Sequence, residues 1–145
     1  MSFLGQYEHN LDAKDRLTVP SKYRAALADG VILAKGLDPS VWVFSPESYE
    51  RFKSNFVGKT NPLGREGRMI RHHFAGLAFD DSLDSAGRVR VPKKLQDHAG
   101  LESGSCVIVG AEDWFQIWNP KRWETYEKEM DAQISDVAEN LAEVE

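Results

Sequence analysis

The stretch DAKDRLTVPSK, residues 12–22, recurs as DSAGRVRVPKK, residues 84–94, and this duplicated unit decides the fold. Both copies have the pattern Asp-x-x-x-Arg-x-x-x-Pro. A second pair of matching segments follows them in the same order, VWVFSPESY at residues 41–49 and FQIWNPKRW at residues 115–123. Two independent matches in one order indicate a duplicated structural unit rather than chance similarity.

Each copy predicts the same succession of elements. A strand enters the Asp-x-x-x-Arg turn, a second strand leaves it, and the proline begins a short helical turn. Ser45 and Asn119 each precede a proline, which predicts the N-caps of two longer helices. The strands are predicted where β-branched or aromatic residues lie between turn residues. They are residues 3–10, 16–19, 31–34 and 41–44 in the first half, and 89–91, 106–109 and 115–118 in the second.

The net charge of −5 is unevenly distributed along the 145 residues. Residues 124–145 hold eight acidic residues and one base, which gives −7, so the preceding 123 residues carry +2. A body of +2 attracts nucleic acid only weakly, so any DNA contact needs local clusters of bases or several subunits acting together.

The acidic tail also carries apolar residues at helical spacing. We expect this stripe to dock on the body or on a neighbouring chain. Its members are Met130, Ile134, Val137 or Ala138, Leu141 and Val144.

No grouping of residues supports an enzyme, so we predict no catalytic residue, no cofactor and no metal site. Cys106 lies in an apolar strand and is interpreted as a buried structural cysteine. His72 and His73 are adjacent on a predicted helix and point to different sides, which makes them poor co-ligands. A single cysteine and the lack of a run of about 18 apolar residues favour a cytoplasmic protein without a membrane partner.

The paired motifs at residues 12–20 and 84–92 resemble those of the MraZ family, and the resemblance extends to about Tyr126. The family is built from two tandem SpoVT-AbrB domains. The implied fold class is α+β, with two tandem AbrB-like swapped-hairpin β units that form one pseudo-dimeric barrel with flanking helices. The implied domains are residues 5–50 and 77–123, with a linking helical segment at 51–76 and an acidic amphipathic helix at 124–145.

The resemblance also implies a function. Members of the family are expected to be sequence-specific transcriptional regulators, usually repressors. They are expected to bind short direct repeats in double-stranded DNA upstream of the division and cell-wall gene cluster. They are expected to form ring-shaped homo-oligomers at the nucleoid. One residue departs from the family pattern, because Asp15 stands where the family has glycine, whereas Gly87 keeps it. Aspartate tolerates the left-handed turn, but it adds a carboxylate beside Arg16.

The candidate DNA-binding residues are the bases around the two motifs, because cations meet phosphates and arginine can read guanine in the major groove. An arginine that follows Asp-x-x-x can instead pair with that aspartate and hold the turn. The resemblance favours the first motif as the main contact, whereas the extra bases of the second favour that one. The candidates are Lys14, Arg16, Lys22 and Arg24 in the first copy, and Arg88, Arg90, Lys93 and Lys94 in the second.

Two further interpretations stay open. A second basic group lies in the linking segment and consists of Lys59, Arg65, Arg68 and Arg71. It could contact phosphates or form a subunit interface. The residues favour a third interpretation, a solvated helix face. The alternative function is an antitoxin-like protein-interaction module that uses the acidic amphipathic tail.

Overall fold

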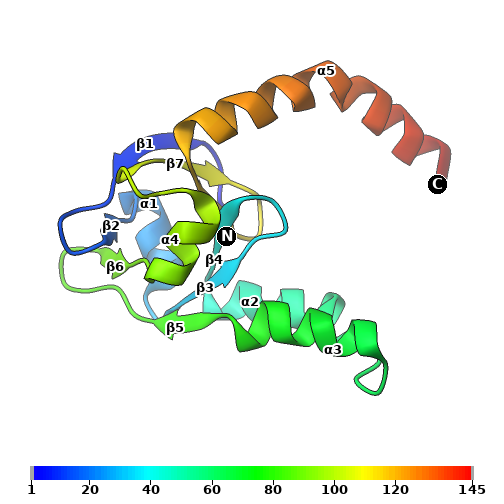
Figure 1. Ribbon diagram of the computed structural model, residues 1–145, viewed down its shortest axis with the longest axis horizontal. Helices are drawn as coiled ribbons and strands as arrows, with labels where there is room; N and C mark the ends of the chain where they lie inside the picture. Colours follow the sequence, from blue (N-terminus) through cyan, green and yellow to red (C-terminus); the bar gives the residue numbers. More distant parts are fainter. Residues whose placement is uncertain (1, 145) are drawn as a thin grey trace.

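The two copies form matching runs of elements in the computed structural model, which describes residues 2–144 (Figure 1). The first copy comprises β1 (Gln6–Asn10), β2 (Arg16–Thr18), α1 (Ser21–Arg24), the short helix η1 (Ala25–Leu27), β3 (Val31–Lys35), β4 (Ser40–Phe44) and α2 (Pro46–Asn55). The linking segment comprises η2 (Val57–Lys59), α3 (Arg65–Arg71) and the π-helical turn η3 (His72–Gly76). The second copy comprises β5 (Phe79–Asp81), β6 (Arg88–Arg90), α4 (Lys93–Ala99), β7 (Ser105–Gly110), β8 (Phe115–Trp118) and α5 (Pro120–Val144). The fold is therefore α+β, as predicted.

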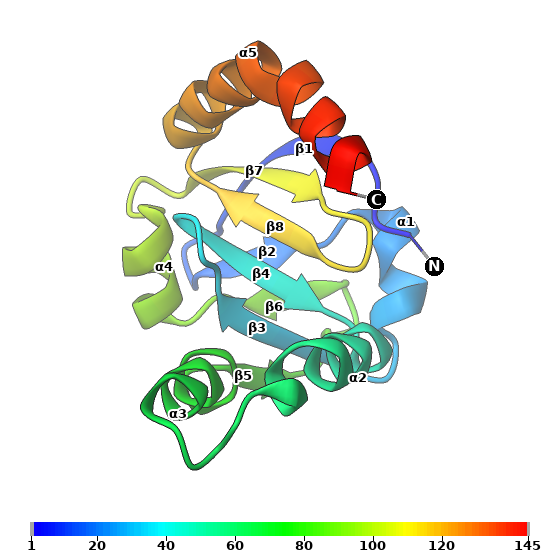
Figure 2. The same cartoon turned by 90° about the vertical axis from the view of Figure 1, so that its right-hand side faces the viewer.

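The two copies exchange their first strands. A six-stranded antiparallel sheet has the order β1-β7-β8-β4-β3-β5, so β1 pairs with β7 of the other copy and β5 pairs with β3. The equivalent strands β4 and β8 pair at the centre. The order is the same from either end when the copies are interchanged, which gives the sheet a pseudo-two-fold arrangement (Figure 2). Within residues 2–144 the sheet is open, with β1 and β5 at its edges, so the closed barrel stays a prediction.

The central strands bury side chains on both faces because successive residues of a strand point to opposite sides. In β4, Val41 and Val43 join the main core, whereas Trp42 and Phe44 join an aromatic cluster on the other face. The main core combines residues of both copies beneath the two-stranded β2–β6 sheet. Neither copy buries this surface alone, so the fold needs both.

The linking segment docks on the outer face of the sheet through Phe74. Its ring stacks on Trp42 with centroids 5.9 Å apart, and its carbonyl oxygen accepts a hydrogen bond of 3.1 Å from the Tyr49 hydroxyl. These contacts fix η3 against β4 and α2.

The predicted helix starts are confirmed. The Ser45 hydroxyl accepts a hydrogen bond of 3.0 Å from the Ser48 N–H, and the Ser48 hydroxyl accepts one of 3.0 Å from the Ser45 N–H, which together form a capping box at α2. The Asn119 side-chain oxygen accepts from the N–H groups of Lys121 and Arg122 at the start of α5. Both caps satisfy N–H groups that a helix leaves without partners.

The long helix α5 leaves the body after its second turn (Figure 1). Trp123 packs on Trp118, with ring centroids 5.3 Å apart, and is 8% exposed. Farther along, the apolar stripe is exposed, while the side chain of Val144 and the whole of Glu145 lie outside the described residues. Within residues 2–144, α5 and the other helices are too short or too polar to span a bilayer.

The capping box gives the first testable prediction. Ser45→Ala should lower the free energy of unfolding by about 1–2 kcal/mol, because the Ser48 N–H loses its acceptor in a buried setting. The matched control is Ser54→Ala on the exposed side of the same helix, which should change it by less than about 0.5 kcal/mol. Urea unfolding followed by circular dichroism measures both; equal effects of the two substitutions would contradict the capping role.

Candidate nucleic-acid interface

One carboxylate organises each copy of the turn. The Oδ1 atom of Asp12 accepts hydrogen bonds from the N–H groups of Lys14 and Arg16 at 2.8 and 2.9 Å, and its Oδ2 atom accepts one of 2.8 Å from the Arg16 Nε–H. In the second copy, Asp84 accepts equivalent bonds from Ala86 and Arg88 at 3.0, 2.9 and 2.8 Å. We call this set of bonds the carboxylate bracket. Its repetition atom for atom shows that the sequence repeat is also a structural repeat.

The bracket holds each arginine by Nε only. Among the described residues, the Nη1 and Nη2 atoms of Arg16 and Arg88 have no protein partner. The two side chains are 29% and 33% exposed. The structure therefore combines the two interpretations of these arginines, because each one holds its turn and still presents free donors to solvent.

The two turns are also bonded to each other's copy. The Val19 N–H donates to the Gly87 carbonyl at 2.9 Å, and the Val91 N–H donates to the Asp15 carbonyl at 2.8 Å. Between these bonds, β2 pairs antiparallel with β6, with Leu17 opposite Val89. We call this unit the β2–β6 ribbon; it joins the two motifs into one surface (Figure 1).

The outer face of the β2–β6 ribbon is basic. Leu17 and Val89 point into the core, so the residues on either side of them point outward. Arg16 lies opposite Arg90, and Arg88 lies opposite Thr18. Like charges directly opposite each other destabilise a strand pair, and a bound anion would relieve that repulsion.

Lysines border this face. Lys14 lies in the first turn. Lys93 and Lys94 open α4, and Pro92 separates them from the Val91 that bonds to that turn. Lys93 is 3.7 Å from the Asp97 carboxylate, and its side chain remains 70% exposed. In the first copy, the Lys22 ammonium lies 5.1 Å from the centre of the Tyr7 ring, a cation–π contact.

Arg24 is the candidate that the fold itself engages most. Its Nε–H donates to the Val19 carbonyl at 2.9 Å. A Cβ atom added at Gly87 would lie 2.7 Å from the Arg24 Cζ, so the guanidinium occupies the space that a side chain at Gly87 would need. The repeat places Gln96 at the equivalent position of the second copy, where its amide donates to the Val91 carbonyl at 2.9 Å. Sequence reasoning missed this pair, although the offset between the two motifs could have found it.

The departure at Asp15 lies at the left-handed position of the turn. Asp15 and Gly87 both adopt left-handed backbone conformations, with φ of 62° and 77°. Gly87 faces the long Arg24 side chain, whereas the second copy has the shorter Gln96 at the position equivalent to Arg24. The first turn accommodates a side chain at this position, whereas a Cβ atom added at Gly87 would collide with Arg24.

The hydrogen bonds of the carboxylate bracket lower the pKa of both aspartates. Hydrogen bonds from the Arg16 and Lys14 N–H groups, together with the Arg16 side chain, lower the pKa of Asp12. The Arg88 N–H and side chain lower the pKa of Asp84 in the same way. Both carboxylates therefore stay ionised, and each offsets part of the charge of its arginine.

Two residues outside the ribbon, Cys106 and Arg71, have structural roles. Burial raises the pKa of the Cys106 thiol to about 11, which keeps it protonated and unreactive near neutral pH. In the linking segment, Arg71 donates to the Thr60 carbonyl at 2.9 Å and so helps to hold its loop.

The fold and the β2–β6 ribbon define a duplicated, strand-exchanged α+β protein with a basic two-stranded surface. The chain matches the family of the MraZ protein, described as antitoxin-like, over residues 2–65 and 74–144. Proteins named Transcriptional regulator MraZ are similar to it over nearly their whole length. They include those of Roseiflexus castenholzii, 38% identical over 98% of both chains, Lactiplantibacillus plantarum, 36% identical over 96% of this chain and 97% of the relative, and Ligilactobacillus salivarius, 33% identical over 96% of both. The chain belongs to the MraZ family.

The contact between Arg24 and Gly87 gives a second prediction. Gly87→Ala should lower the free energy of unfolding by at least about 2 kcal/mol, because it combines an unfavourable φ with displacement of Arg24. Asp15→Gly, the reverse change in the other copy, should alter it by less than about 1 kcal/mol. In an Arg24→Ala background, Gly87→Ala should be less damaging. Additive effects in this double-mutant cycle would contradict the coupling.

The lowered pKa values of Asp12 and Asp84 give a third prediction. A carboxyl group whose folded pKa is lowered stabilises the fold above its ordinary pKa, and this stabilisation is lost as pH falls through the lowered value. The double variant Asp12→Asn, Asp84→Asn should therefore be less stable than wild type at pH 7, and the difference should shrink toward about pH 3. Urea midpoints measured across this range test it. A difference independent of pH would show that the charge of the bracket plays no part.

Proposed function

We propose that this chain is a sequence-specific DNA-binding transcriptional regulator that contacts DNA through the β2–β6 ribbon. The observation that supports it most is the outward face of the ribbon, which gathers Arg16, Arg88 and Arg90 from the two copies of the motif. The names of its relatives support the same class of protein.

The β2–β6 ribbon has the strand pairing and the basic side chains that this role requires. A two-stranded ribbon fits a major groove that is roughly 12 Å wide, where arginine donates two hydrogen bonds to guanine. Arg90 is the outward arginine without an ion-pair partner among the described residues, so it is our first candidate for a base contact. Lys14, Lys93 and Lys94 at the border suit phosphates, because lysine acts as a point charge.

Helix α1 of the first copy adds Lys22 and Arg24 to the proposed contact surface, although both already contact protein groups. Because the ribbon joins the two turns, we propose that both motifs contact DNA as one surface. Neither motif is then the main contact by itself. We further propose that the strand-exchanged sheet and the ribbon together correspond to the pseudo-dimeric swapped-hairpin barrel of tandem AbrB-like units.

The finer biological role rests on the family resemblance. We propose that the protein binds short direct repeats in a promoter and represses the division and cell-wall gene cluster at the nucleoid. A body of +2 binds one short site weakly, so several copies in a homo-oligomer would raise the effective concentration of each next contact.

A second candidate function, an antitoxin-like protein-interaction module, is favoured by one observation. The helix α5 is acidic and leaves Ile134 and Leu141 51% and 65% exposed, which suits a helix that lies in the groove of another protein. This function predicts a partner bound through α5, whereas the first predicts salt-dependent DNA binding through the ribbon.

The fourth prediction tests the DNA-binding proposal. Fragments of the source organism's own DNA that the wild-type protein selects serve as the probe. Arg90→Ala removes a cation without breaking a bracket, so it should weaken binding about tenfold or more and leave the unfolding midpoint nearly unchanged. The double variant Arg16→Ala, Arg88→Ala should weaken it further. Each phosphate contact that is lost should also lower the slope of log affinity against log salt by about 0.9.

The matched control is Lys53→Ala, which removes a positive charge from α2. It should bind the same fragments nearly as wild type does. Wild-type affinity in a folded triple variant lacking Arg16, Arg88 and Arg90 would contradict the ribbon as the contact surface.

A further inference from the structure

The β2–β6 ribbon has two ends, one at each carboxylate bracket, and each end combines residues of both copies. The first end comprises residues 12–16 and 90–94, and the second end comprises residues 84–88 and 18–22. Interchange of the two copies would place one end on the other. Any difference between the ends therefore arises from the side chains at equivalent positions.

One pair of equivalent positions on the outward face of the ribbon differs. Arg16 and Arg88 correspond to each other, whereas Thr18 corresponds to Arg90. Because Arg16 lies opposite Arg90 and Arg88 lies opposite Thr18, the first end presents two arginines and the second end presents one arginine and a threonine. Thr18 and Arg90 are both exposed. The difference therefore lies on the surface that would meet DNA.

The formal charge differs between the ends in the same direction. The first end carries +3 and the second end carries +1. Arg90 and Lys93 account for the difference, because Lys14 in the first turn is balanced by the neighbouring Asp15. Arginine donates two hydrogen bonds to guanine, whereas threonine can contact any base. The first end is therefore better suited to guanines than the second end is.

We propose that Thr18 and Arg90 fix the direction in which the chain lies on its DNA site, with the first end over the half of the site that holds more guanines. This inference rests on the proposed DNA-binding function and adds a direction to it. A ribbon with two equal ends would bind equally well after rotation about its pseudo-two-fold axis, because the carboxylate bracket and the strand pairing are the same at both ends. The difference between Thr18 and Arg90 makes one direction more favourable than the other.

A fixed direction also decides which kind of DNA site suits the ribbon. A binding unit with two-fold symmetry matches a palindromic site, because the symmetry of the site mirrors that of the protein. A ribbon with unequal ends matches a unit that has no internal symmetry. Units of that kind can follow one another as direct repeats, each bound in the same direction.

Cleavage of DNA by a tethered iron chelate measures this direction and is the fifth prediction. The full-length protein carries the chelate on one introduced cysteine, either Ala13→Cys in the first turn or Ser85→Cys in the second. Cys106 is buried, so the introduced thiol is the one that reacts. The probe is a duplex with one copy of the unit shared by fragments that the wild-type protein selects from the source organism's own DNA. A single unit is used because several chains on a repeat would fix one another's direction.

The chelate at position 13 should cut the flank beside the guanine-rich half at least about fivefold more than the other flank, because a bidentate arginine contact discriminates between bases by this much or more. The chelate at position 85 should show the opposite preference. The exchange variant, Thr18→Arg with Arg90→Thr, moves the arginine pair to the second end and leaves +2 on each end. In this variant the flanks cut from the two positions should be exchanged. Thr18→Arg alone places two arginines at both ends, so each chelate should cut both flanks to a similar extent.

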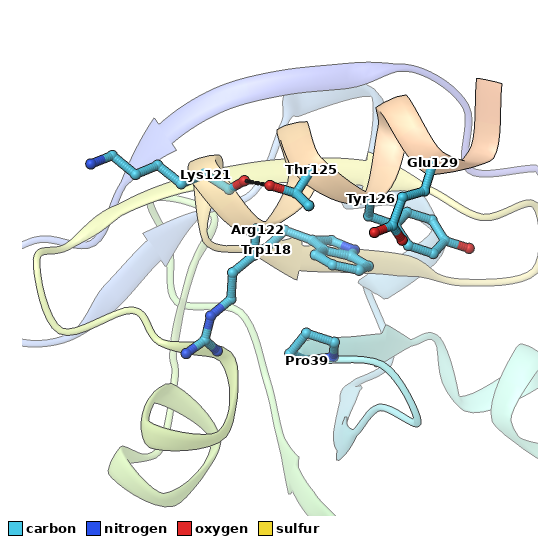
Figure 3. A pocket seen from close by; sticks show the side chains of 7 residues that line it. All are labelled: Pro39, Trp118, Lys121, Arg122, Thr125, Tyr126 and Glu129. Atoms are coloured by element: carbon cyan, nitrogen blue, oxygen red, sulfur yellow. Dashed lines mark hydrogen bonds between the residues drawn. The ribbon is translucent and has the colours of Figure 1, made fainter. Parts of the chain in front are cut away.

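The matched control exchanges a cation and a threonine on α5, with Lys121→Thr and Thr125→Arg. These side chains extend from the first turns of α5, beside a groove of about 660 Å³ over Trp118 (Figure 3). Ile117 belongs to the main core beneath the ribbon, so the adjacent Trp118 points to the opposite face of the sheet. The control should therefore keep the cutting pattern of the wild-type ribbon. Circular dichroism confirms that each variant is folded.

Three results would overturn the proposal and leave the DNA-binding function intact. Equal cutting of both flanks by the wild-type ribbon would show that the chain has no preferred direction. Cutting of the guanine-poor flank from position 13 would show the opposite direction, and a wild-type pattern in the exchange variant would show that other residues set it. If the exchange variant does not fold, Thr18→Arg alone decides, since a preference kept with arginine pairs at both ends would equally overturn the proposal. Binding without cutting from either turn would instead contradict the ribbon as the contact surface, and the proposed direction would be refuted with it.

Discussion

The carboxylate bracket is the interaction on which the rest of the structure depends. Asp12 and Asp84 each gather two backbone N–H groups and one arginine Nε–H, and this fixes the turn in which the left-handed residue lies. The carbonyl of that residue then accepts a hydrogen bond from the other copy. The bracket therefore sets the local turn, the pairing of β2 with β6 and the direction of the arginines at once.

The two copies have diverged where they contact each other. A long Arg24 faces Gly87, and a shorter Gln96 stands at the equivalent position of the second copy. The outward faces differ too, because Thr18 corresponds to Arg90. A duplicated chain can vary its two halves independently, which two identical chains cannot do, and this gives the ribbon a basic face of unequal halves.

Local features of the fold were predictable from the sequence, and long-range ones were not. The spacing of Asp12 to Pro20 and its recurrence located the turns and strands, and Ser45 with Pro46 located a helix start, because caps and turns depend on adjacent residues. Exchange of β1 and β5 between the copies was not visible in the residues themselves and entered only through the family resemblance, because antiparallel partners far apart in sequence leave no local pattern. The role of Arg24 depends on its contacts with Val19 and Gly87, which its position in the sequence does not reveal. The sequence alone therefore suggested a base available to DNA.

The central claim is that both copies of the motif form one DNA-contacting surface. Hydrogen exchange of the backbone amides, with and without a selected DNA fragment, tests it most directly because it examines the whole chain at once. The account predicts added protection in peptides covering residues 12–24 and 84–96 together. Protection confined to one of these segments, or found only in the linking segment or α5, would contradict it.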